Sequence, residues 1–176
     1  MDRRTFIAGA AVLPSATTLA SPALLQSSPL RDKVLGAWRI LDAETVDVKT
    51  GASVPWLNRA RPYSGTIIYL PNGMMSVQIG SARGPGRVGA GIQNLSNEEK
   101  IGLLETYYAY HGRFEVDEAQ SKVRHFVEHS LYEFETGKTL VRSIRLAGAV
   151  LTLSTDNLFL GPDGSQTFNR LKWARL

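Results

Sequence analysis

The sequence contains no cysteine among its 176 residues. Disulfide bonds, thiolate nucleophiles, iron–sulfur clusters and cysteine-bound zinc are therefore excluded for this chain. A run of lysine or arginine is also missing, although 20 Lys and Arg outnumber 16 Asp and Glu and give a formal charge of +4. Because this excess is mild and dispersed, we expect no nucleic-acid partner.

Other functional signatures are absent too. The chain has no apolar run of the roughly 20 residues that a transmembrane helix needs, so we expect no stable membrane anchor. Phosphate-binding loops, dinucleotide fingerprints, the Gly-x-Ser-x-Gly elbow and zinc-protease motifs do not occur, and we predict no cofactor. The composition, 43% apolar and 20% charged, is typical of a soluble globular protein, and the length fits one domain.

The first 23 residues have the pattern of an export signal. Arg3 and Arg4 precede a short apolar stretch from Ala8 to Leu13, and small residues follow as far as Ala23. The paired arginines are similar to a twin-arginine signal, which exports folded proteins. An ordinary secretory signal is the alternative. We therefore expect a periplasmic or extracellular protein.

Cleavage divides the chain into three parts. We predict a cut after Ala23, with Ala20 as the second choice, because small residues precede signal cleavage sites. Residues 24–33 are then a linker, and residues 34–176 form a single folded domain. An exported domain without cysteine must gain its stability from its core alone.

The predicted domain is all-β, because turns separate its short apolar runs. Residues 65–70 and 74–79 flank a turn at Pro71–Gly73 and predict a hairpin. A capping box at Ser96 and Glu99 predicts one helix, which we expect to end near Tyr110. Further strands are expected at residues 36–45, 112–116, 122–131, 140–146, 150–155 and 167–176. The pattern indicates an antiparallel up-and-down barrel of about eight strands.

Several short motifs occur in order along this domain. They are Gly36-x-Trp38-Arg39, Val54-Pro55-Trp56, Gly65-x-x-x-Tyr69-x-Pro71-Asn72-Gly73-x-Met75-Ser76, Tyr110-x-Gly112-x-Phe114-x-Val116-Asp117, Val123-x-His125-x-Val127-x-x-Ser130, Arg142, Leu151-Thr-Leu153-Ser154 and Leu171-x-Trp173-x-Arg175. Together they resemble the bacterial and fungal lipocalin-like domain family, a calycin-type barrel. The resemblance implies that the first-strand tryptophan packs against an arginine of the last strand, Arg175 or Arg170, and closes the barrel base.

The expected interior contains polar residues. Strand alternation places His125 and His129 on the inward face with Val127, and it places Arg142 on the inward face of its own strand. A buried arginine needs an acceptor. We therefore predict that His125, His129, Arg142 and Tyr69 form a polar cluster, either an internal network that fixes the strands or a ligand-facing site.

These residues favour a protein that binds a small hydrophobic or amphipathic molecule inside the barrel. The predicted walls are Trp56, Tyr69, Met75, Phe114, Val127 and Ile144. His125 and Arg142 would orient a polar or acidic group. One alternative is a cofactor-free isomerase or cyclase, in which His125 is the acid or base and Arg142 stabilises a developing anion. Another is a filled barrel that interacts with proteins through the glycine-rich loop at residues 80–91.

The sequence predicts no metal site. His125 and His129 lie on one expected strand, where residues four apart are separated by about 13 Å and cannot hold the same ion. Haem bound by His125 has no support from any other residue. The sequence leaves the ligand's identity, catalysis and the oligomeric state open.

Overall fold

The computed structural model describes residues 29–82, 91–161 and 163–176. Within these residues one antiparallel sheet closes on itself, because β1 pairs with both β3 and β10. The eight strands of the barrel wall are β1 (Gly36–Asp47), β3 (Ser64–Tyr69), β4 (Met74–Gly80), β5 (Tyr107–Asp117), β6 (Lys122–Ser130), β7 (Thr139–Ala147), β8 (Val150–Thr155) and β10 (Gln166–Arg175). The predicted all-β barrel is confirmed.

Alternation explains which side chains fill the barrel. The β3–β4 hairpin pairs Tyr69 with Met75. Its inward residues Ile67, Tyr69, Met75, Val77 and Ile79 are each at most 3% exposed. Burying such a side chain contributes about 1.5–3 kcal/mol. The predicted inner face of this hairpin is therefore confirmed.

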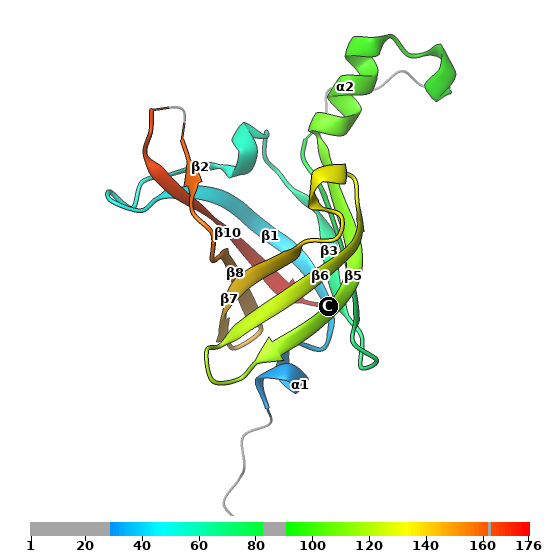
Figure 1. Cartoon of the computed structure of the whole chain (residues 1–176). Helices are drawn as coiled ribbons and strands as arrows, with labels where there is room; N and C mark the ends of the chain where they lie inside the picture. Colours follow the sequence, from blue (N-terminus) through cyan, green and yellow to red (C-terminus); the bar gives the residue numbers. More distant parts are fainter. Residues whose placement is uncertain (1–28, 83–90, 162) are drawn as a thin grey trace, which may run out of the picture.

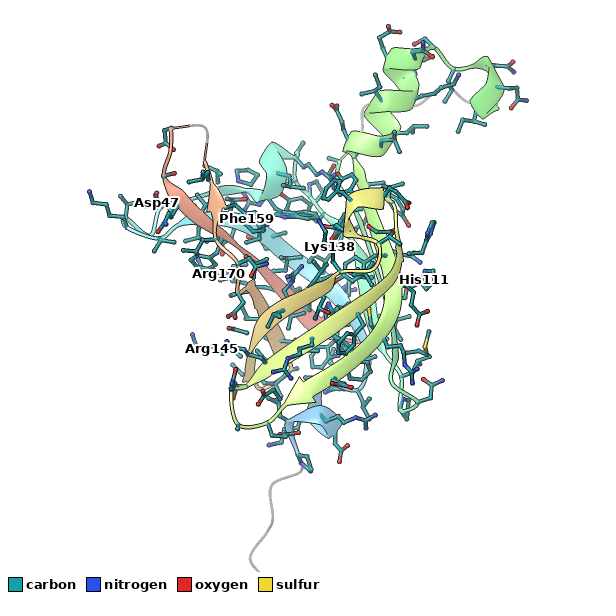
Figure 2. All side chains as sticks on the ribbon, in the orientation of Figure 1. Asp47, His111, Lys138, Arg145, Phe159 and Arg170 are labelled. Carbon is teal, nitrogen blue, oxygen red and sulfur yellow. The ribbon has the colours of Figure 1, made fainter. Side chains whose placement is uncertain are left out.

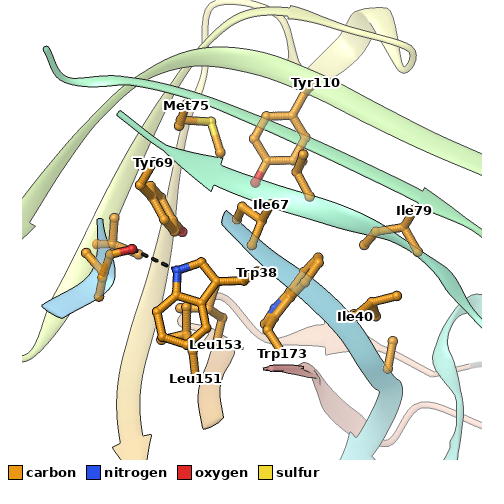
Figure 3. Packing of buried hydrophobic residues seen from close by; sticks show 14 of the residues in the cluster. Trp38, Ile40, Ile67, Tyr69, Met75, Ile79, Tyr110, Leu151, Leu153 and Trp173 are labelled. Carbon is orange, nitrogen blue, oxygen red and sulfur yellow. Dashed lines mark hydrogen bonds between the residues drawn. The ribbon is translucent and has the colours of Figure 1, made fainter. Parts of the chain in front are cut away.

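The base of the barrel is closed by helix α1 (Leu30–Val34) and by Trp38. The Trp38 indole (Figure 3) donates a hydrogen bond of 2.8 Å to the Val34 carbonyl. The Arg175 guanidinium lies 4.1 Å from the centroid of the Trp38 ring. Of the two arginines predicted to make this contact, Arg175 is the one. Arg170 instead donates to Glu44, at 2.7 Å from Nε to Oε1.

The opposite end of the barrel is its mouth. The short strands β2 (Ser53–Pro55) and β9 (Phe159–Leu160) extend the edges of β1 and β10 there. The 3₁₀ turns η1 (Trp56–Asn58) and η3 (Glu133–Glu135) also lie at this end, together with α2 (Asn97–Glu105), while α1 lies at the base (Figure 1). A third turn, η2 (Ile92–Asn94), precedes α2. None of the helices among the described residues is long and apolar enough to cross a membrane.

Helix α2 begins as predicted and ends early. Its capping box at Ser96 and Glu99 is present, but the helix stops at Glu105 and not near Tyr110. Strand β5 begins at Tyr107, which pairs with Gly80 of β4. Pairing with β4 and burial of alternate tyrosines outweigh the helical spacing of this segment. The predicted signal, the first half of the predicted linker (residues 24–28) and residues 83–90 of the predicted loop lie outside the described residues.

Candidate functional site

His125 is held between two tyrosines at the centre of the barrel. Its Nε2 lies 2.8 Å from the Tyr69 hydroxyl, and its Nδ1 lies 2.7 Å from the Tyr110 hydroxyl. The histidine is 1% exposed. Because both ring nitrogens are engaged, neither is free to exchange a proton directly with a substrate.

Burial and a neighbouring charge control the ionisation of this group. Desolvation lowers the pKa of His125 well below its usual value, and the positive charge of Arg142 acts in the same direction. Burial raises the pKa of Tyr110 to about 12, although Arg142 opposes that shift. Burial also raises the pKa of Tyr69. The site therefore holds a neutral imidazole between two protonated phenols.

The part of the barrel around His125 is filled. Tyr69 packs edge-on against Phe114, with 4.8 Å between ring centroids. Tyr69, Met75, Phe114 and Val127 are between 0% and 4% exposed. Side chains with so little exposed surface are closely packed against their neighbours. These predicted wall residues form a solid floor in the lower half of the barrel.

Toward the mouth the interior opens. Along β10, inward-facing Trp173 is 1% exposed, whereas Leu171, Asn169 and Thr167 are half-buried. Polar groups appear at this level. The Thr45 hydroxyl donates to the Asn169 side-chain oxygen at 2.9 Å, and the backbone N–H of Asn169 donates to the Thr155 hydroxyl at 2.9 Å. The upper half of the barrel is thus lined by both apolar and hydrogen-bonding side chains.

Arg142 lies inside this upper half. It pairs with Val123 of β6 and Thr155 of β8, both inward-facing, so its side chain shares their face. It is half-buried, and Nη1 donates to the Val141 carbonyl at 3.0 Å. Within the described part of the chain no carboxylate lies within 4 Å of its guanidinium. Arg142 is therefore an inward cation without a charged partner among these residues. Ile144 follows it on the same face and is 9% exposed.

The prediction that His129 points inward is wrong. A β-bulge interrupts the pairing of β5 and β6 opposite His111 and Gly112. Gly112 pairs with Val127, but His111 pairs with His129, so β6 has one residue more than β5 at this point. The extra residue on β6 turns His129 to the outer surface, where its ring lies 6.2 Å from that of His111. Figure 2 shows His111 projecting away from the barrel.

Two hollows open at the mouth and share Leu57. One, of about 710 Å³, faces the inner side of the strand extensions and is lined by Thr45, Val54, Leu57, Phe159, Leu160 and Asn169 among others. The other, of about 640 Å³, is lined by residues that include Leu57, Arg59, Glu105, Tyr132 and Phe134. Trp56 is 4% exposed and packs edge-on against Tyr108 behind them, at 5.3 Å between ring centroids.

Comparison with known proteins agrees with this geometry. A family model described as a lipocalin-like domain matches residues 35–176. The chain belongs to the lipocalin-like domain family. No curated protein and no solved structure matches the sequence. A lipocalin-like barrel supports small-molecule binding in general terms, and the arrangement of filled floor and open mouth restricts where such a molecule fits.

Two residues of the lipocalin-like barrel were not among the predicted site residues. Tyr110 holds His125, but extending the helix to Tyr110 hid the inward alternation of Tyr108, Tyr110 and Gly112 on β5. Continuing the β5 pattern backward from Phe114 would have found it. Arg59 follows a 3₁₀ turn in a segment without any periodicity, so no sequence signal marked it.

Proposed function

We propose that this lipocalin-like protein binds a small, mainly apolar ligand in the upper half of its barrel. The observation that carries the proposal is the inward cation Arg142, without a carboxylate partner among the described residues, above a filled floor. Leu171, Ile144 and the mouth hollows supply apolar contact for the body of the ligand. Pockets of this kind bind by burying apolar area, with a few polar groups that fix orientation.

In this proposal the predicted site residues have separate tasks. Arg142 donates hydrogen bonds to a carbonyl or hydroxyl group of the ligand. His125 is a positioning residue that fixes Tyr69 and Tyr110 in the floor, since both of its nitrogens are engaged. Binding therefore depends on shape and on the polar groups of the upper half.

Replacing Arg142 tests the proposal. We expect Arg142→Met to weaken binding of 1-decanol about tenfold. The substitution removes the guanidinium that donates to the ligand's hydroxyl group, and methionine keeps a similar side-chain volume. Isothermal titration calorimetry measures the change. Arg145→Met is the matched control: the residue lies on the same strand and is exposed (Figure 2), so the affinity should be unchanged. Equal affinities for the two variants, or no binding by the native protein, contradict the proposal.

We also propose that residues 1–23 direct twin-arginine export to the periplasm or the exterior. Arg3 and Arg4 support this, since the pathway reads the arginine pair. In a fusion of the signal to a folded reporter, changing both residues to lysine should abolish export, as measured by cell fractionation. Export of the double-lysine reporter at the native level would assign the signal to the ordinary secretory pathway.

A further inference from the structure

Like Arg142, Arg59 at the mouth is a cation without a carboxylate partner among the described residues. It is 8% exposed, and its Nη1 is buried with no hydrogen-bond acceptor. Its Nη2 donates to the Tyr132 hydroxyl and, at 3.4 Å, to the Tyr107 carbonyl. The guanidinium lies 5.0 Å from the Trp56 ring centroid. A charged group is costly to bury unless an opposite charge accompanies it.

The described residues do not supply that opposite charge. Among the described residues no carboxylate lies within 4 Å of the Arg59 guanidinium. Glu135, three residues after Tyr132, accepts hydrogen bonds from the Tyr108 and Ser130 hydroxyls, both at 2.9 Å. Residues 83–90 contain two arginines and no acid. Arg59 is thus a buried donor without an anionic partner among the described residues.

The residues around Arg59 indicate which kind of anion would fit beside it. The residue lines the hollow of about 640 Å³ together with Leu57, Tyr132 and Phe134. Leu57 and Phe134 are 47% and 68% exposed, so the rim is apolar. The Tyr132 oxygen accepts from Arg59, which leaves its hydroxyl hydrogen for a second acceptor. Glu105 also lines the hollow and would repel a multiply charged anion more than a singly charged one.

We infer that Arg59 and Tyr132 form a binding site for a carboxylate, the head group of an amphipathic monoacid whose apolar chain enters the barrel. A guanidinium and a hydroxyl side by side match the two oxygens of a carboxylate. The inference rests on the proposed function for the position of the apolar chain. It assigns the mouth, and not Arg142, as the place where the negative charge is recognised.

The test compares decanoate with 1-decanol by calorimetry at pH 7.5, below the micelle concentration. The native protein should bind decanoate about tenfold to a hundredfold more tightly than 1-decanol. This ratio corresponds to the free energy that one charge-assisted hydrogen bond contributes to binding. Arg59→Met should abolish this preference by weakening decanoate binding to the level of 1-decanol binding. Arg59→Lys keeps the charge without the planar fork, so we expect it to retain part of the preference.

A nearby arginine provides the matched control. Arg61 forms an ion pair with Asp42 at 2.7 Å and does not line the hollow, so Arg61→Met should retain the full preference. If Arg142→Met removes the preference and Arg59→Met keeps it, the mouth site is overturned while the barrel proposal stands. If acetate binds in an Arg59-dependent manner and 1-decanol does not bind, the anion site stands and the barrel proposal fails. Equal binding of decanoate and 1-decanol by the native protein overturns the inference.

Discussion

Gly112→Ala should lose at least about 3 kcal/mol of unfolding free energy, the largest stability effect that we expect from a single methyl group. A Cβ at this position would lie 2.0 Å from the Phe126 carbonyl oxygen and 2.9 Å from the Glu128 amide nitrogen. Both contacts are with backbone, which cannot rotate away. Relief requires β5 and β6 to separate at the bulge that turns His129 outward. Urea denaturation measures the loss.

Gly102→Ala is the control for this change. The residue lies within α2, and nothing is within 4 Å of its added Cβ. Alanine is preferred over glycine in a helix by about 1 kcal/mol, so this variant should be as stable as the native protein or slightly more stable. Equal stabilities of the two variants would mean that the strands are not held in close contact at Gly112.

Acidification from pH 6.5 to pH 5 should destabilise the protein through His125. Burial lowers the pKa of the His125 ring in the folded state, so in this pH range the ring is protonated in the unfolded chain and neutral in the folded protein. Stability is thus fully present above the unfolded pKa and decreases as the pH falls below it. The neutral imidazole also fits its two tyrosine partners.

The measurement is the unfolding free energy across this pH range in the native protein and in two variants. His125→Gln cannot ionise, so its stability should depend less on pH between 6.5 and 5. His129→Gln removes an exposed ring from the outer surface and should keep the native dependence. The same pH dependence in the native protein and His125→Gln would show that other groups control acid unfolding.

The sequence was sufficient for the barrel because its strands obey period-two alternation. Ile67 and Val77 on paired strands are both buried, and Arg142 faces inward from the same rule. Alternation failed where the pairing itself is irregular. The bulge beside Gly112 depends on the close approach of two backbones, so counting from His125 to His129 gave the wrong face.

The candidate site was predicted only in part, for physical reasons. Strand alternation predicts that Tyr69, Phe114 and His125 are inside. It does not show whether side chains fill the space around them, because that depends on packing in three dimensions. The sequence could not predict Arg59 as a site residue, because its proposed role depends on the burial of its unpaired charge. That property belongs to its surroundings and not to its neighbours in the sequence.

A titration of ¹⁵N-labelled protein with 1-decanol, followed by amide chemical shifts, tests the central claim most directly. We expect saturable shifts at Arg142, Thr155, Asn169 and Leu171, which line the upper half of the barrel, and little change at His111 and His129 on the outer surface. The absence of saturable shifts, or shifts confined to the outer face of β5 and β6, would contradict ligand binding inside the barrel.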